Sequence, residues 1–76
     1  MSDPIIMHWD RVMHKNVRSS DSTDVGNIIS EAGDDFTIMQ GASREYNLPK
    51  SYVEGFNGSE VFLSLSYSDL QKFKVR

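Results

Sequence analysis

An Asn-Gly dipeptide between two segments of alternating apolar residues restricts the fold of this chain more than any other feature. Val53 to Phe56 precede Asn57-Gly58, and Glu60 to Leu65 follow it. Asn-Gly is the dipeptide best suited to a type I′ turn, in which both central residues need a positive φ. The sequence therefore predicts a β-hairpin that is closed by a type I′ turn at Asn57-Gly58.

The second arm of this hairpin shows which side chains face the core. Val61, Leu63 and Leu65 alternate with Phe62 and Ser64. Successive side chains of a strand point to opposite faces of the sheet, so the first set is expected to face the core and the second set to face outward. Phe62 is then an outward-facing aromatic residue and a candidate for an interface.

A second hairpin is expected upstream, where two runs rich in β-branched and large apolar residues are separated by residues 33–35 (Gly-Asp-Asp). The runs are Val25 to Ala32 and Phe36 to Gln40, and glycine can take the positive φ that a tight loop needs. Glu45 to Leu48 then alternates and ends at Pro49. Proline cannot donate to a strand ladder, so Pro49 predicts either the end of pairing or an edge strand.

The N-terminal region is the least readable part of the chain. Its apolar residues, among them Ile5, Trp9 and Val12, fit either a strand followed by a loop or a short helix. We expect residues 1–14 to form a flexible extension and the first strand to lie around Lys15 to Arg18.

The C-terminal region predicts a short helical turn. Ser66 or Ser68 can cap it, and Tyr67, Leu70 and Phe73 recur at helical spacing. The expected fold class is therefore all-β: a small barrel or sandwich of about six short strands over residues 15–76, with a short helical turn at its end.

Length and composition limit the kinds of protein that this chain can be. With 76 residues it is expected to form one domain, and a domain of this size buries only about 60% of the surface of its unfolded chain. The chain has no cysteine, so disulfides and zinc-thiolate sites cannot stabilise it, and self-association is the expected supplement. Met1 to Met7 lacks the basic start of a signal peptide and no apolar run reaches about 18 residues, so we expect no membrane span and a cytoplasmic location.

The order of the predicted segments resembles the PRC-barrel family, in which an opening strand is followed by a Val-Gly-x-Ile/Val strand, a Tyr-x-Leu/Ile-Pro-Lys segment, a Val-x-Gly/Val-x-x-Gly hairpin and a Val-x-Leu strand. The matching residues are Val17 to Asp21 leading into Val25-Gly26-Asn27-Ile28, then Tyr46-Asn47-Leu48-Pro49-Lys50, then Val53-Glu54-Gly55-Phe56-Asn57-Gly58 and Val61-Phe62-Leu63. The resemblance covers roughly residues 15–73 and is closest to the small stand-alone members found in archaea and bacteria. The chain departs from the family pattern at residues 21–24, where Ser-Thr-Asp replaces a glycine-containing turn.

This resemblance implies a six-stranded barrel-like fold that acts as an adaptor, often as a dimer. Family members serve in ribosome assembly, in photosynthetic complexes and in archaeal cell division, and a shared fold does not choose among these settings. The expected function is a non-enzymatic protein–protein interaction module, self-associating as a homodimer or binding another protein, in cell division or in the assembly of a larger complex.

The sequence offers no assembled catalytic, metal or cofactor site. His8 and His14 are the only histidines, with Asp10 between them, and no zinc-ligand spacing is present. The acidic residues lack the spacing of an EF-hand loop, and the glycines form no phosphate-binding motif. We therefore expect neither catalysis nor a cofactor.

Outward-facing apolar residues are the expected interface. Ile29 and Met39 fall out of phase with Ile28 and Ile38, as Phe62 does with its neighbours. If all three lie on adjacent strands, they form a patch large enough to drive association. Trp9 is a further candidate contact, which docks on its own domain, on a second subunit or on a partner, with docking on its own domain preferred.

An RNA-linked accessory factor is the alternative of a different class. It would use Lys50, Lys72, Lys74 and Arg76 as phosphate contacts. The net charge is −3, from 8 basic and 11 acidic residues, and a basic footprint is usual for proteins that bind nucleic acid. We therefore expect no nucleic acid as the main partner.

Overall fold

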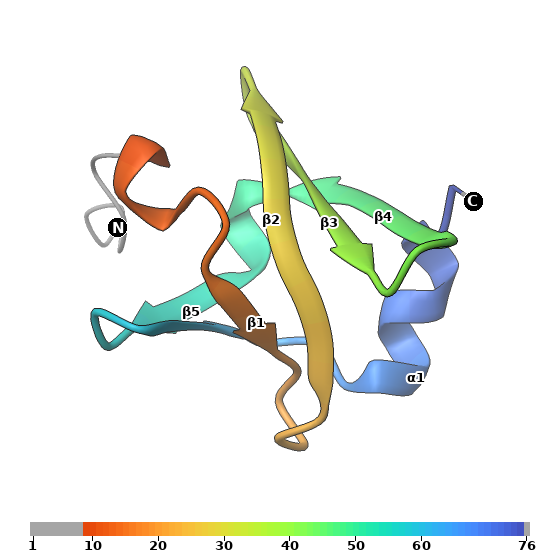
Figure 1. The fold of residues 1–76 in the computed structure, drawn as a ribbon. Coiled ribbons are helices and arrows are strands. Elements are labelled where there is room, and N and C mark those ends of the chain that lie inside the picture. Colours follow the sequence, from red (N-terminus) through yellow and green to blue (C-terminus); the bar gives the residue numbers. More distant parts are fainter. Residues whose placement is uncertain (1–8, 76) are drawn as a thin grey trace.

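The structure, a computed structural model, describes residues 9–75. Its strands are β1 (Asn16–Arg18), β2 (Asp24–Ala32), β3 (Asp35–Gln40), β4 (Arg44–Pro49), β5 (Val53–Phe56) and β6 (Glu60–Leu63). Its short helices are the 3-10 turns η1 (Trp9–Val12), η2 (Lys50–Tyr52) and η3 (Gln71–Phe73) and the α-helix α1 (Tyr67–Leu70). The expectation of a mostly β domain with a short C-terminal helical turn is confirmed (Figure 1).

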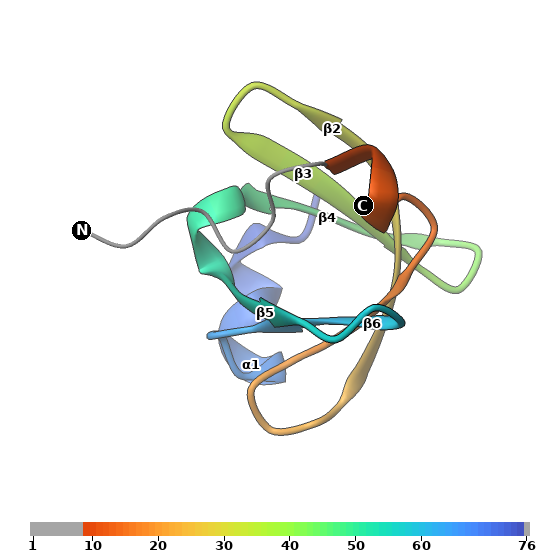
Figure 2. The same cartoon turned by 90° about the vertical axis from the view of Figure 1, so that its left-hand side faces the viewer.

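The strands form one curled sheet in the order β4-β3-β2-β1-β6-β5. Neighbours run antiparallel except β1 and β6, which pair in parallel. The sheet bends around its core, as Figure 2 shows, but β4 and β5 do not pair with each other. The structure is therefore an open mixed sheet, and the expected closed barrel is not what it shows.

The C-terminal segment gives a physical reason for the open sheet. Lys74 forms an isolated antiparallel bridge with Tyr46 of β4, and the Val75 N–H donates to the Glu45 carbonyl at 2.8 Å. These contacts occupy part of the outer edge of β4, which a closed barrel would give to β5. Main-chain groups at an edge have only one free side for pairing, so the two arrangements exclude each other there.

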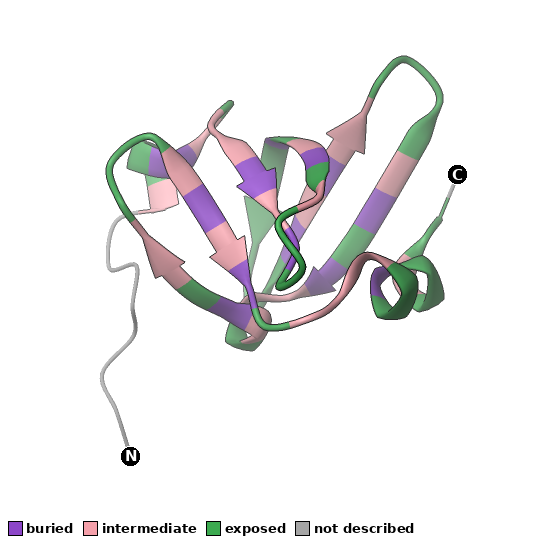
Figure 3. Ribbon diagram, turned by 90° about the horizontal axis from the view of Figure 1, so that it is seen from below, coloured by how far each residue is buried: buried purple, intermediate pink, exposed green. Residues whose placement is uncertain are grey.

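The core lies inside the curl of the sheet and receives side chains from every strand, from η1 and from α1. Buried and exposed residues alternate along the strands, most clearly in β3, β4 and β6 (Figure 3). The core consists of Val12, Val17, Val25, Ile28, Phe36, Ile38, Tyr46, Leu48, Val53, Val61, Leu63 and Leu70. The predicted phase of the last strand is confirmed at Val61 and Leu63, which are fully buried, and Leu65 packs against the core.

Both predicted hairpins are present, but the turn of the second one differs from the expectation. Gly58 has φ +98°, whereas Asn57 is not among the residues with positive φ, so the type I′ assignment is wrong. The Asn57 N–H donates to the Glu60 carbonyl at 3.1 Å. This bond makes Asn57 and Glu60 the pair that flanks the turn, with Gly58 and Ser59 between them.

The packed domain begins earlier than residue 15. Trp9 to Met13, which we assigned to an N-terminal extension, include the turn η1, and Val12 is fully buried in the core. The His14 N–H donates to the Ile28 carbonyl at 2.7 Å, which holds this segment against β2. Residues 1–8 of the predicted extension lie outside the described part of the chain.

Ser66 caps the C-terminal helix, as one of the two predicted alternatives. Its hydroxyl oxygen accepts the Asp69 N–H at 3.1 Å, and the helix places Leu70 in the core. Tyr67 and Phe73 pack against the core beside it. The cap and the single buried face together explain a helix that covers one end of the curled sheet.

Candidate interaction surface

Two irregularities in β2 decide which of its side chains face outward. The first lies at Gly26, where Arg18 pairs with Asp24 and Asn16 pairs with Asn27, so that β2 has one residue more than β1. Gly26 has φ +104°, and a Cβ there would lie 2.1 Å from the Met39 carbonyl oxygen. A β-bulge that brings two backbones this close needs glycine.

The second irregularity places Ile29 on the surface. Ile28 pairs with Ile38 and Ser30 pairs with Thr37, so Ile29 is the extra residue of a bulge. Its side chain is 37% exposed. Met39 lies on the adjacent strand β3, paired with Asn27, and is half-buried without belonging to the core. Ile29 and Met39 together are called the Ile29 face below.

Phe62 does not join the Ile29 face. It lies on β6, pairs with Arg18 of β1 and Gly55 of β5, and is half-buried. Since β1 stands between β6 and β2 in the sheet, the three apolar residues are not all on adjacent strands. The condition for one continuous patch is therefore not met.

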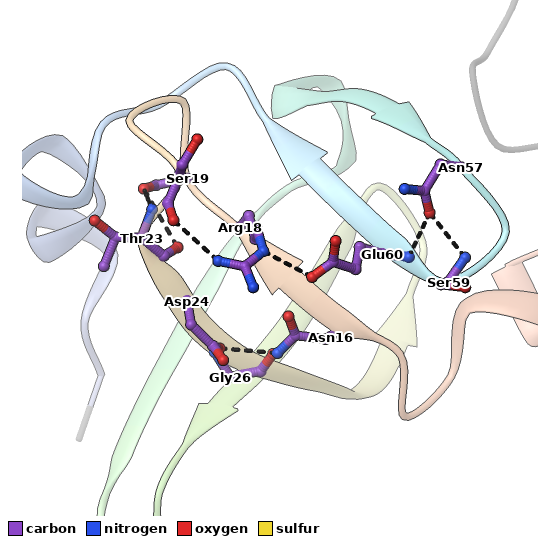
Figure 4. Close-up of polar contacts among 10 residues, drawn as sticks. Asn16, Arg18, Ser19, Thr23, Asp24, Gly26, Asn57, Ser59 and Glu60 are labelled. Carbon is purple, nitrogen blue, oxygen red and sulfur yellow. Dashed lines mark hydrogen bonds and ion pairs between the residues drawn. The ribbon is translucent and has the colours of Figure 1, made fainter.

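A polar network occupies the outward side of the sheet between Phe62 and the Ile29 face (Figure 4). Asn16 Nδ2 donates to Asp24 Oδ1 at 2.8 Å and to the Gly26 carbonyl at 3.0 Å. Arg18 Nε donates to Glu60 Oε2 at 2.7 Å. The bond from Asn16 and the N–H of Gly26 lower the pKa of the Asp24 carboxyl, and the hydrogen bond to Glu60 raises the pKa of Arg18.

Trp9 packs on its own domain, which is the alternative that we preferred from the sequence. Its ring centroid lies 5.0 Å from that of Phe36 in β3, and Lys50 Nζ lies 4.8 Å from the Trp9 ring centroid. Lys50 also forms an ion pair with Glu31 of β2. These contacts use Trp9 to fix the N-terminal turn, and they leave only part of its side chain on the surface.

Within the described part of the chain, the candidate phosphate contacts do not form one cluster. Lys50 lies at the end of β4 and is paired with Glu31, whereas Lys72 and Lys74 follow the C-terminal helix and are exposed. Lys74 lies opposite Tyr46, in the middle of β4. Arg76 lies outside the described residues.

Sequence reasoning missed a cluster of hydrogen-bonded side chains at the C-terminal end of the molecule. Gln40 Oε1 accepts the Tyr46 hydroxyl at 2.7 Å and the Tyr67 hydroxyl at 3.2 Å. Gln71 Nε2 donates to the Tyr46 oxygen at 3.3 Å, and Arg44 Nη1 donates to the Tyr67 oxygen at 3.2 Å. Burial raises the pKa of Tyr46.

The signal for this cluster was present in the alternation of β4. A tyrosine on the inward face needs a partner for its hydroxyl. Only the tertiary structure shows that the partners come from β3 and the C-terminal helix. The cluster links these elements and is best explained as a structural connection.

Two further observations concern the part of the chain that the structure describes. Within residues 9–75, no group of three or more His, Cys, Asp or Glu side chains is placed to hold a metal ion. None of the helices over the same residues has the length and apolar character needed to cross a membrane. His8, one of the two histidines of the chain, lies outside these residues.

Comparisons of the chain with protein-family models, with curated proteins and with solved structures find no match.

Proposed function

We propose that this domain is a non-enzymatic interaction module that self-associates through the Ile29 face. The observation that carries the proposal is the bulge in β2, which holds the 37% exposed side chain of Ile29 on the outward side of the sheet, next to Met39. Bulges re-aim side chains at functional positions, and an apolar surface on adjacent strands favours association. The occupant that we propose is a second copy of the chain, related by a two-fold axis.

The charged residues near the Ile29 face are already paired within one chain, which supports a second copy of the chain as the binding partner. Arg18 is paired with Glu60, and Asp24 accepts the Asn16 amide, so these polar groups already have partners before association. Burying an unpaired charge is costly, whereas a surface whose polar groups are satisfied loses less when water leaves it. Two copies of a chain with net charge −3 can therefore approach through this side of the sheet.

The small size of the domain supports self-association independently. A chain of 76 residues without cysteine gains little from its own core, and a dimer interface adds buried apolar surface. Phe62, on the other side of the polar network, is proposed as a peripheral contact of the same interface.

The PRC-barrel resemblance belongs to the same proposal. Its matching segments coincide with β1, the start of β2, β4, the β5–β6 hairpin and β6. An adaptor of that family fits a small domain that offers an outward sheet surface. The RNA-linked alternative has weaker support, because Lys50 is paired with Glu31 and the chain has a net charge of −3. An RNA complex would lose affinity steeply with added salt, whereas an apolar interface would not.

Light scattering over a wide concentration range tests the proposal. We expect the native chain to reach the mass of a dimer and Ile29→Asp to remain a folded monomer. The matched control is Val75→Asp, because Val75 is also an exposed apolar residue, at 60%, but lies on the C-terminal segment. Val75→Asp should dimerise like the native chain. A native chain that stays monomeric throughout, or equal loss of dimer in both variants, would overturn the proposal.

A further inference from the structure

The side chain of Asn57 is held in an unusual way by the β5–β6 turn. Asn57 Oδ1 accepts the Ser59 N–H at 2.9 Å and the Glu60 N–H at 2.8 Å (Figure 4). The Gly58 N–H has no hydrogen-bond partner among the described residues, and neither has Asn57 Nδ2. Asn57, Gly58 and Ser59 are all exposed to solvent.

In the other asparagines of the described residues, the amide nitrogen Nδ2 donates a hydrogen bond. Asn16 Nδ2 donates to Asp24, Asn27 Nδ2 donates to the His14 carbonyl, and Asn47 Nδ2 donates to Thr37. Each of these three is followed by a fully or almost fully buried strand residue, respectively Val17, Ile28 and Leu48. In Asn57 the carbonyl oxygen is bonded and the amide nitrogen is free.

We propose that Asn57 is a modification site at which the folded protein converts its own side chain to a mixture of aspartate and isoaspartate. In the first step the backbone nitrogen of Gly58 attacks Cγ of Asn57. A bond forms between this nitrogen and Cγ, and the bond from Cγ to Nδ2 breaks. The proton lost by the Gly58 nitrogen leaves with the amide group as ammonia, and a cyclic succinimide remains.

Water completes the reaction without any oxidant or reductant. It adds to one of the two succinimide carbonyls and opens the ring. Attack at the side-chain carbonyl gives aspartate, and attack at the main-chain carbonyl gives isoaspartate, in which the backbone runs through the former side chain. Either product adds one negative charge to the −3 of the chain.

The turn favours this reaction in three respects. Negative charge develops on Oδ1 during the attack, and the N–H groups of Ser59 and Glu60 already point at this atom, as donors do in an oxyanion hole. The attacking nitrogen belongs to a glycine, which has no side chain to hinder its approach, and Gly58 is exposed to solvent. The leaving nitrogen is not retained by a hydrogen bond to the described residues.

Trypsin separates the relevant asparagines into different peptides, which makes the test direct. Cleavage after lysine and arginine places Asn57 in residues 51–72, Asn47 in residues 45–50, Asn27 in residues 19–44 and Asn16 in residues 16–18. The native chain is incubated at neutral pH, both folded and unfolded in guanidinium chloride. Each peptide is then quantified by mass spectrometry for the mass gain of an amide-to-acid conversion and for the earlier-eluting isoaspartate form.

We expect conversion in the folded protein to be confined to residues 51–72, at a rate at least equal to that of the unfolded chain. Conversion of Asn57 only after unfolding, or equal conversion of the four peptides in the folded chain, would overturn the proposal. Neither result depends on a variant, so a folding defect cannot obscure the answer.

Two variants test the assigned roles. Ser59→Pro removes one N–H donor to Oδ1 and is expected to slow conversion by up to about tenfold, less than the loss of a donor in a buried oxyanion hole because this site is exposed to water. Asn57→Gln is the matched control: its longer side chain disfavours ring closure, and residues 51–72 should stay unmodified. An unchanged rate in a folded Ser59→Pro variant would overturn the role of the N–H donors.

Discussion

At the scale of single residues, Gly26 has the least freedom to change. It combines a positive φ with a Cβ position that the backbone of β3 already fills, and it lies in the bulge next to β1. The same bulge brings Asp24 and Asn27 to the outward side of β2, where Asp24 accepts the Asn16 amide. One glycine thus determines how the polar network is arranged.

We expect Gly26→Ala to lower the free energy of unfolding by about 3 kcal/mol or more, because the new Cβ would meet the Met39 carbonyl at 2.1 Å in a left-handed backbone conformation. Gly55→Ala is the matched control. Gly55 also lies in a strand, but it has no positive φ and its Cβ position is open, so we expect a change within about 0.5 kcal/mol. Urea titrations followed by circular dichroism measure both values, and equal losses would contradict the assigned role of Gly26.

Asp24 links the polar network to pH. Its pKa in the folded state lies below the ordinary value of 3.8, mainly because Asn16 donates to its carboxylate. The unfolded chain therefore takes up a proton on Asp24 more readily than the folded chain does. The contribution of the Asp24 carboxylate to folding stability is complete above about pH 4, and it is lost as the pH falls through the lower folded pKa. Protonation removes the acceptor that the Asn16 amide prefers.

For Asp24→Asn we expect a loss of stability at neutral pH that shrinks as the pH is lowered below about 4, because the asparagine does not titrate. Urea unfolding of both proteins at a series of pH values measures the difference. Parallel curves over the whole range would show that the Asp24 carboxylate does not contribute in this way.

At the scale of elements, β6 has two faces that differ in burial. Val61 and Leu63 are fully buried, whereas Phe62 between them is half-buried and lies outside the core cluster. A shift of one residue in its pairing with β1 would exchange these faces. The parallel pairing of Asn16 with Glu60 and of Val17 with Val61 maintains the register.

Leu63→Asp is expected to unfold the domain, because it buries an unpaired carboxylate, at a cost of about 4 kcal/mol or more. Phe62→Asp is the matched change one residue away, and it should leave the chain folded while weakening self-association. Circular dichroism and light scattering on both variants distinguish these outcomes. If both variants unfold, or neither does, the assignment of the faces of β6 is wrong.

At the scale of the whole molecule, the N- and C-terminal segments complete the structure from two ends of the curled sheet (Figure 1). The turn η1 inserts Val12 into the core and packs Trp9 on Phe36. The C-terminal segment adds Leu70 to the core and occupies part of the edge of β4. A sheet of this size gains stability when both open ends are covered by apolar side chains.

We expect Val12→Ala to lower the free energy of unfolding by about 2 kcal/mol, from the lost methyl groups and the cavity that remains. The adjacent control Arg11→Ala removes an exposed side chain and should change stability by no more than about 0.5 kcal/mol. Thermal and urea unfolding measure both. If Val12→Ala left the free energy of unfolding unchanged, the packed domain would begin at residue 15 instead.

The local features of this protein could be read from its sequence. The hairpins around Gly33 and Gly58, the end of β4 at Pro49 and the cap at Ser66 each depend on one residue and its close neighbours. The alternation of β6 identified Val61 and Leu63 as inward-facing residues for the same reason. Even within a turn, the preference of Asn-Gly for a type I′ geometry did not predict that Asn57 lacks a positive φ.

Only the tertiary structure decided how these pieces combine. The parallel pairing of β1 with β6 and the occupation of the β4 edge by Lys74 and Val75 join residues far apart in the chain. The bulges at Gly26 and Ile29 join neighbouring strands, but they too arise only when the strands pair. Such pairings depend on which edge is free and on how the sheet curls, and no local pattern encodes either. The sequence by itself therefore determined the strands, the positions of the two hairpin turns and the inward face of β6. The open sheet, the separation of Phe62 from Ile29 and the inclusion of Val12 in the core follow from long-range contacts that form only when the whole chain packs.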